Sequence, residues 1–163
     1  MSASALLAAG AVAAPGALLA AAQALPIATR LHHVGIIMPD AARMLELAQL
    51  FGLSAQRTYY VEAYQADCHF MAGGLGAGAA IEFIVPRGGK LASFNRGAGG
   101  LHHLALEVAD LKQASELLEA QGIVLLERAP VPAGPLDINF VPPAYTWGVI
   151  VEIVQCNTPP SST

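Results

Sequence analysis

Two stretches of the chain share one pattern of apolar and polar positions. Residues 31–38 and 101–108 are short apolar runs, and runs of this length predict β-strands rather than helices. An aspartate follows each run, Asp40 in the first stretch and Asp110 in the second. Apolar residues then recur at helical spacing, so each aspartate is predicted to cap the start of a helix by accepting its free backbone N–H groups.

These stretches are two copies of one sequence unit. Residues 31–53 align with residues 101–123 without a gap, and seven positions are identical. The last of the identical positions aligns Gly52 with Gly122, where each predicted helix should stop, because glycine readily adopts the left-handed conformation found there. An internal repeat of this kind predicts a fold built from two similar modules.

Each copy is followed by three further segments with the composition and bounds of strands. They are residues 57–64, 66–72 and 79–85, with a glycine-rich hairpin at 73–78, and then residues 123–129, 136–141 and 148–155. Each module therefore has the order βαβββ, and the predicted fold is α+β, with two tandem modules around a cleft. Module 1 spans residues 31–85, a linker spans 86–100, and module 2 spans 101–155.

Alternation along the first strands assigns the second histidine of each His-His pair to the cleft. Successive side chains of a strand point to opposite faces. His33 and His103 then point away from the apolar face that packs on the helices. His32 and His102 fall on the helix-facing side, where a structural role is expected.

The last strand of each module contributes one glutamate to the same cleft. Glu82 and Glu152 are the only charged residues in their apolar strands, and a buried carboxylate is costly unless something compensates its charge. Glu82 follows His33 by 49 residues, and Glu152 follows His103 by the same 49. Two modules that face each other would bring two imidazoles and two carboxylates together.

Two nitrogen and two oxygen donors suit a divalent transition metal such as Co, Ni, Mn, Fe or Zn. The predicted ligands are His33, Glu82, His103 and Glu152. The alternative is that these are ordinary strand residues and that the glutamates lie on a wet sheet face. The match in residue type, face and spacing across the repeat favours the metal site, and Cys68 and His69 are further candidates for the cleft wall.

Composition fits one domain and excludes some functions. The chain has 163 residues and a net charge of −4, which offers no basic patch for nucleic acid. Cys68 and Cys156 lie far apart and fit neither a zinc motif nor a disulfide framework, so both are expected to be free thiols in a reducing compartment.

Residues 1–30 are an alanine-rich segment outside the repeat, expected to be a tail or an appended helix, and residues 156–163 are a short tail. The segment lacks the basic start of a signal peptide, and Pro15 and Gly16 interrupt its apolar run. Neither a membrane span nor export is therefore expected, and a cytoplasmic location is predicted. Export, with cleavage after the small residues at 22–24, is the alternative.

The histidine and glutamate pattern resembles the vicinal oxygen chelate superfamily, whose glyoxalase fold pairs two βαβββ modules around a metal-binding cleft. The stretches SFNRGAGGLHHLALEVADL (93–111) and GVIVEIVQ (148–155) are most similar to methylmalonyl-CoA epimerases. The metal ligands of that family correspond here to His33, Glu82, His103 and Glu152. Lactoylglutathione lyases are similar and use the same ligand types.

The resemblance implies a metal-dependent epimerase, isomerase or lyase that binds a small-molecule substrate such as an acyl-CoA, and it implies a homodimer. In that chemistry the metal polarises a carbonyl or thioester, and a carboxylate moves the neighbouring proton. Some epimerases use a third-strand glutamate as the base, but this chain has Cys68 near that position. Glu82 or Glu152 is therefore the predicted catalytic base, and Glu107, assigned to the cleft face, is another candidate.

The loop at residues 141–148 departs from the family, which typically has a lysine there. Pro143, Tyr145 and Trp147 occupy it here, so the cleft mouth is expected to favour a more apolar substrate, such as that of a specialised biosynthetic isomerase or lyase. Two other functions occur on this fold. An Fe(II) dioxygenase would leave Glu82 without a role, and a non-enzymatic ligand-binding protein would not need the metal set.

Overall fold

The computed structural model describes residues 27–72 and 78–157. Their strands form one eight-stranded sheet in the order β2-β3-β4-β1-β5-β8-β7-β6. The N-terminal segment, the glycine-rich hairpin and the C-terminal tail, about which the sequence makes predictions, lie wholly or mainly outside the described residues.

Both modules have the order βαβββ that the repeat predicts, so the α+β fold is confirmed. Module 1 contains β1 (Ala28–Ile37), α2 (Ala41–Leu50), β2 (Ser54–Val61), a 3-10 turn (Glu62–Tyr64), β3 (Ala66–Ala72) and β4 (Ala80–Pro86). A second 3-10 segment (Leu91–Gly97) lies between the modules. Module 2 contains β5 (Gly100–Val108), α3 (Leu111–Ala120), β6 (Val131–Ala133), β7 (Leu136–Val141), a 3-10 turn (Pro143–Tyr145) and β8 (Ile150–Cys156).

Each helix begins and ends as the sequence predicts. Asp40 and Asp110 each accept a hydrogen bond from the backbone N–H three residues on, at 2.8 and 2.9 Å. Gly52 (φ +63°) and Gly122 (φ +80°) follow the last helical turns in the left-handed conformation. Within the described ranges, neither of these helices nor any other is long and apolar enough to cross a membrane.

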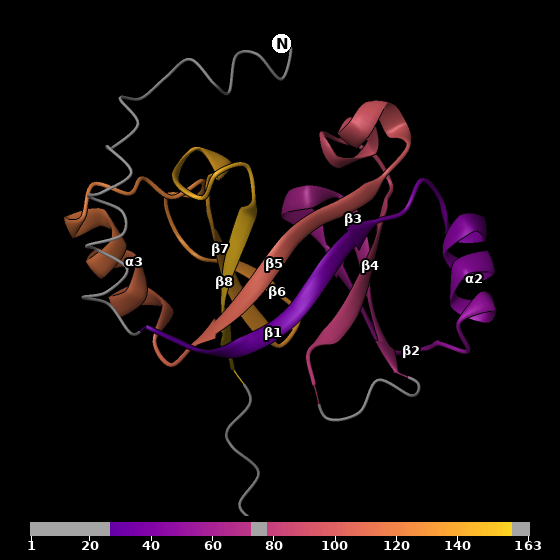
Figure 1. Cartoon of the computed structure of the whole chain (residues 1–163), viewed down its shortest axis with the longest axis horizontal. Helices are drawn as coiled ribbons and strands as arrows, with labels where there is room; N and C mark the ends of the chain where they lie inside the picture. Colours follow the sequence, from indigo (N-terminus) through magenta and orange to yellow (C-terminus); the bar gives the residue numbers. More distant parts are fainter. Residues whose placement is uncertain (1–26, 73–77, 158–163) are drawn as a thin grey trace, which may run out of the picture.

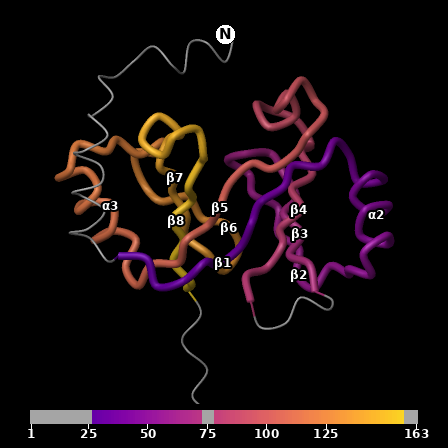
Figure 2. Tube along the Cα trace, in the orientation of Figure 1, coloured from indigo at the N-terminus to yellow at the C-terminus, as the bar shows by residue number. Residues whose placement is uncertain are grey.

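The first strands of the two modules lie side by side at the centre of the sheet (Figure 1). β1 and β5 pair antiparallel, and each also pairs in parallel with the last strand of its own module, β4 or β8. The tube in Figure 2 shows α2 and α3 at opposite ends of this arrangement. The four central strands therefore come from both modules in equal number.

Each helix covers an apolar cluster, and a third cluster joins the modules. Met44 of α2 packs in a cluster with Phe83 of β4, and Leu111 of α3 packs in one with Ile153 of β8. On the other face of the sheet, a cluster shared by both modules includes Val61, Phe70, Ala105, Phe140 and Val154. The alternation of side chains between the two sheet faces that was predicted for β4 and β8 is thus confirmed. Phe83 and Ile153 face the helices, and the neighbouring Glu82 and Glu152 face the other way.

The strand predicted at residues 123–129 is absent from the described part of module 2, where only the short strand β6 lies near it. Ile123 and Leu125 are buried beneath α3 without strand pairing. The Asn139 side chain takes the place of a pairing strand, because it accepts from the Glu127 N–H at 3.1 Å and donates to the Glu127 carbonyl at 3.0 Å. Val124 and Leu126, in contrast, are exposed. The pairing through the Asn139 side chain leaves no signal in the pattern of apolar and polar residues.

The second strand of module 1 is also displaced from its predicted range of 57–64. β2 begins at Ser54 and ends at Val61, and the last three predicted residues form the 3-10 turn instead. Gln65, which follows that turn, has a left-handed backbone with φ +50°. The chain therefore reverses direction before β3 within a shorter space than an extended strand would allow.

The orientation predicted for His32 and His102 is wrong, because each residue lies at a β-bulge. In the β1–β5 register, Leu31 pairs with Leu106 while His33 pairs with Ala105, so His32 is an extra residue on β1. In the same way, Gly35 pairs with His103 while Ile36 pairs with Leu101, so His102 is an extra residue on β5. Alternation fails at a bulge.

The rings of both bulge residues therefore turn toward the neighbouring histidine instead of the helices. His32 Nδ1 lies 2.7 Å from His33 Nδ1, and His102 Nδ1 lies 2.9 Å from His103 Nδ1.

Gly35 is required by the close approach of β1 and β5. A methyl group added at this buried position would collide with the His103 ring, whose Nδ1 would lie 2.7 Å away. We expect Gly35→Ala to lower the free energy of unfolding by about 1–3 kcal/mol, because overpacking forces paired strands or a buried ring to move. Urea unfolding of the purified protein measures this change.

The matched control is Gly88→Ala. Its added methyl group would meet only the end of the Gln65 side chain, at 2.9 Å, which can move aside. Its effect should stay within about 0.5 kcal/mol. Equal losses in the two variants would contradict the steric role of Gly35.

Candidate functional site

The four residues singled out by the repeat converge at the centre of the sheet. His33 lies on β1, Glu82 on β4, His103 on β5 and Glu152 on β8. Their exposed fractions are 1%, 5%, 3% and 4%. The two Nε2 atoms lie 3.0 Å apart, and the carboxylate oxygens lie 3.0–3.5 Å from these nitrogens.

The strand register explains this convergence. His33 pairs with Ala80 in β4, so two further residues along β4 bring Glu82 beside it on the same face. His103 pairs with Ile150 in β8, and Glu152 stands two residues further on in the same way. Parallel pairing within each module and antiparallel pairing between them therefore place four donors around one point.

Charge within this cluster is balanced. Burial alone would lower the pKa of an imidazole, but Glu152 and Glu82 raise the pKa of His33 to about 9 and that of His103 to about 10. Burial also opposes ionisation of the carboxyl groups, yet the two histidines hold the pKa of each glutamate below its usual range. At neutral pH, and without a metal ion, the cluster thus holds two carboxylates whose charge is compensated by protons on the imidazoles.

The donor set and its spacing fit a divalent transition metal. Bonds of about 2.1 Å place neighbouring ligand atoms about 3.0–3.4 Å apart, close to the observed separations of 3.0–3.5 Å. Glu152 Oε2 is buried without a hydrogen-bond partner among the described residues, although both Nε2 atoms are near it. An oxygen left in this way has lone pairs available for a cation.

The first histidine of each pair holds the second in place. Burial and the adjacent His103 lower the pKa of His102 to about 4, and burial and the adjacent His33 lower the pKa of His32. Both outer rings are therefore neutral at pH 7 and can accept a hydrogen bond at Nδ1. A ligand histidine that donates from Nδ1 is fixed in orientation and keeps Nε2 for a metal.

A cavity of about 660 Å³ opens from these four residues. Most of its wall is apolar, with aromatic and aliphatic side chains from both modules, including Tyr59, Val61, Phe70, Leu91, Leu126 and Phe140. Its other polar residues include Lys90, Gln65 and the pair Tyr64–Glu127, in which the phenol donates to the carboxylate at 3.0 Å. Burial and Glu127 raise the pKa of the Tyr64 hydroxyl, which therefore stays protonated.

Cys68 and His69 have different environments. Cys68 lines the cavity, and burial together with the Glu82 carboxylate raises the pKa of its thiol. The group therefore stays a thiol at neutral pH. His69 points away from the cavity, and its Nδ1 lies 3.1 Å from the hydroxyl of Thr58.

Two predictions about the site are wrong, because neither Glu107 nor the loop at 141–148 lines the cavity. Glu107 is not among the residues that line the cavity, and its carboxylate pairs with Arg30 at 2.5 Å. Tyr145 of the loop packs on the α3 side of the sheet, and Trp147 is 71% exposed. None of residues 141–148, all of which the structure describes, is part of the cavity wall. The apolar wall instead comes mainly from β2, β3 and β7, together with Leu91 and Leu126.

Several cavity residues had no signal in the sequence pattern. Lys90 and Leu91 lie in the predicted linker, and Leu126 and Glu127 lie in the segment that was predicted as a strand. Their proximity depends on how the two modules close on each other. The His and Glu positions could be found because the repeat supplies each of them twice.

The chain is similar to methylmalonyl-CoA epimerases in sequence. It is 28% identical over 132 residues to the mitochondrial methylmalonyl-CoA epimerase of Dictyostelium discoideum, and the match covers 77% of this chain and 78% of that protein.

Solved structures of similarly named proteins have the same fold. The methylmalonyl-CoA epimerase from Mycobacterium tuberculosis superposes with a TM-score of 0.73 and 25% identity, over 82% of this chain and 91% of the other. A variant of the Streptomyces coelicolor methylmalonyl-CoA epimerase in complex with 2-nitronate-propionyl-CoA has a TM-score of 0.68. It is 21% identical over 80% of this chain and 99% of the other, a likeness that concerns the fold alone.

A family model agrees with these similarities. The model described as the Glyoxalase/Bleomycin resistance protein/Dioxygenase superfamily matches residues 32–140, which is more than half of the chain. The match includes both copies of the βα unit and both His-His pairs. The protein therefore has a glyoxalase-type α+β fold and belongs to the glyoxalase, bleomycin resistance protein and dioxygenase superfamily.

Proposed function

We propose that the protein is a divalent-metal-dependent epimerase that removes and returns a proton next to a carbonyl or thioester, with a methylmalonyl-CoA-like substrate. The convergence of four buried donors at the inner end of an apolar cavity is the observation that carries this proposal. The names of the similar proteins support it, since they are epimerases of an acyl-CoA.

His33, Glu82, His103 and Glu152 are the proposed metal ligands. When bound, the metal acts as a Lewis acid that polarises the substrate carbonyl and so acidifies the neighbouring C–H bond. These four residues would hold the metal at the cavity wall, where it would polarise an oxygen of a bound substrate. Co, Ni, Mn, Fe and Zn all accept such a donor set.

Proton transfer falls to the two glutamates. Glu82 comes from module 1 and Glu152 from module 2, so the pseudo-symmetry places one carboxylate in each half of the site. In this step one glutamate leaves the metal as a carboxylate and accepts the proton. The other glutamate must then be in its carboxylic acid form, and it donates its proton to the opposite face of the carbon and becomes a carboxylate, which inverts the carbon. Cys68 is unsuited to this step, because the raised pKa of its thiol leaves it protonated.

The apolar cavity wall would leave few hydrogen-bond partners for water near the reacting carbon. Aromatic and aliphatic side chains make up most of the wall, and a dry site strengthens the electrostatic interactions inside it. Lys90 is the one lysine or arginine among the described residues that line the cavity. We infer that it lies near an anionic part of the substrate, such as the carboxylate of a malonyl-type acyl group.

A second candidate keeps the same site but changes the substrate. The predominantly apolar wall also suits a specialised isomerase, or a lyase of the lactoylglutathione type, with a less charged substrate. In both cases the glutamates move a proton next to a polarised carbonyl. The substrate that undergoes exchange distinguishes the two candidates.

The proposed ligands predict the metal content. Protein purified without chelator should hold about one metal ion per chain, and His103→Ala should hold little, because a buried donor is lost. His69→Ala is the matched control, since that ring faces Thr58 outside the cavity. Elemental analysis by mass spectrometry measures the content. Equal metal in the wild type and His103→Ala would contradict the proposed ligands.

The raised imidazole pKa values predict proton release on metal binding. Because the raised pKa values keep protons on the imidazoles at pH 7 and a ligand nitrogen must lose its proton, metal binding should release protons. The apparent affinity should rise with pH up to about 9–10, the pKa values of His33 and His103. Calorimetry in buffers of different ionisation enthalpy measures the release. A release of no protons at pH 7 would rule out the protonated pair.

Solvent exchange tests the reaction. Metal-loaded protein in D2O should introduce deuterium next to the thioester of methylmalonyl-CoA, detected by mass spectrometry. Glu82→Gln and Glu152→Gln should slow this exchange by at least about 100-fold, the usual contribution of a general base. Glu46→Gln, an exposed position on α2, is the control.

Metal-loaded protein that gives no exchange with methylmalonyl-CoA would sink the epimerase proposal. Exchange or turnover with a less charged α-carbonyl substrate, such as a hemithioacetal, would then favour the second candidate.

A further inference from the structure

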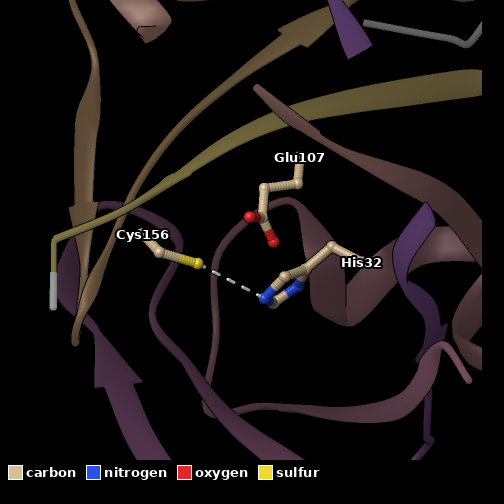
Figure 3. Close-up of side chains that lie close together, drawn as sticks. All are labelled: His32, Glu107 and Cys156. Carbon is tan, nitrogen blue, oxygen red and sulfur yellow. Dashed lines mark hydrogen bonds between the residues drawn. The ribbon is translucent and has the colours of Figure 1, made fainter. Parts of the chain in front are cut away.

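A second group of metal-binding side chains lies outside the cavity. His32 on β1, Glu107 on β5 and Cys156 on β8 each offer one donor atom, and these atoms all lie within 4.8 Å of one another. Figure 3 shows the imidazole, the carboxylate and the thiol gathered around a common space, with Cys156 Sγ 3.8 Å from His32 Nε2. All three side chains are partly exposed, so an ion can reach them from solvent.

We propose that His32, Glu107 and Cys156 form a second metal site, selective for Zn2+. Zinc is bound by imidazole, carboxylate and thiolate donors, and sites with three protein ligands complete the tetrahedron with water. Bonds of about 2.3 Å to sulfur and 2.1 Å to nitrogen place those two atoms about 3.6 Å apart in a tetrahedron. The observed 3.8 Å is close to this value.

An ion pair and a thiol proton compete with zinc for the donor atoms of this site. The Glu107 carboxylate pairs with Arg30, whose side chain is 58% exposed and can turn into solvent. Burial and the Glu107 carboxylate raise the pKa of the Cys156 thiol. Zinc binding therefore releases the thiol proton and frees Arg30, since a ligand sulfur must be a thiolate.

The second site is present in one half of the repeat only. The offset of the repeat is 70 residues, so the partners of His102 that correspond to Glu107 and Cys156 are Ile37 and Pro86. Neither side chain can bind a metal. The cluster of His33, Glu82, His103 and Glu152, here called the main centre, follows from the duplication. The second site does not, so His102 is a natural control.

One contact links the two sites and decides the design of the test. His32 Nδ1 lies 2.7 Å from His33 Nδ1, and a single proton can occupy that contact. When His33 donates it, His32 carries its own proton on Nε2 and cannot bind zinc with that atom. Zinc binding therefore requires the contact to reverse, so that His32 donates from Nδ1 and its Nε2 is free for the metal. The double variant Glu82→Gln/Glu152→Gln weakens the main centre without touching either histidine, so it is the background of choice.

Cobalt absorption distinguishes the two sites. None of the four proposed ligands in the cavity contains sulfur, so a thiolate-to-Co2+ charge-transfer band in the near ultraviolet requires Cys156 or Cys68, the two cysteines of the chain. Variants of each cysteine tell the two origins apart. Titration of the double variant with CoCl2 should produce this band, and ZnCl2 should abolish it by displacement. The band should vanish with Cys156→Ser and persist with Cys68→Ser and with His102→Ala.

A titration that gives no band, or a band that needs Cys68 instead of Cys156, would overturn the proposal. Two further variants test the charges around the site. Glu107→Gln should weaken Zn2+ binding by at least about tenfold, whereas Arg30→Gln should strengthen it several-fold, because the competing cation is removed. Competition against a fluorescent zinc chelator measures both. Zinc affinity that is the same in both variants and in the parent would count against a site at Glu107.

Discussion

The antiparallel pairing of β1 with β5 is the contact on which the rest of the structure depends. It joins the two modules into one sheet and sets the histidines of one module against small residues of the other. His103 faces Gly35, and His33 faces Ala105. Larger side chains at either small position would push the strands apart, and the two Nε2 atoms could no longer lie 3.0 Å from each other.

Burial makes the central cluster unlike the other ion pairs of the protein. Arg43 and Glu46 form a pair in which both side chains are 67% exposed, and such pairs contribute little to stability. Inside the sheet, removal of one charge leaves the others without compensation in a medium of low dielectric constant. A cluster of two imidazoles and two carboxylates is therefore a costly arrangement to bury, which supports the proposal that it binds a cation.

The sequence predicted the centre of this fold better than its periphery. Alternation located Glu82 and Glu152 correctly because β4 and β8 are regular, extended and buried on both faces. It failed at His32 and His102, because a bulge depends on the register between two strands and not on either strand alone.

Other features depended on contacts that a pattern does not contain. The strand expected at 123–129 is replaced by the hydrogen bonds of the Asn139 side chain to Glu127. The ion pair between Arg30 and Glu107 likewise joins residues 77 positions apart, so neither periodicity nor spacing pointed to it. Elements that repeat within the chain could be predicted, whereas single tertiary contacts could not.

The two bulges place each outer histidine in a different chemical setting, although both come from the same repeated motif. His102 lines the cavity and stacks edge-on with Phe94, whereas His32 meets a thiol and a carboxylate away from it. In an assembly of identical single modules, any substitution would appear at both positions at once. A fused pair has two independently inherited codons, so one histidine can acquire new partners while its counterpart continues to serve the cavity.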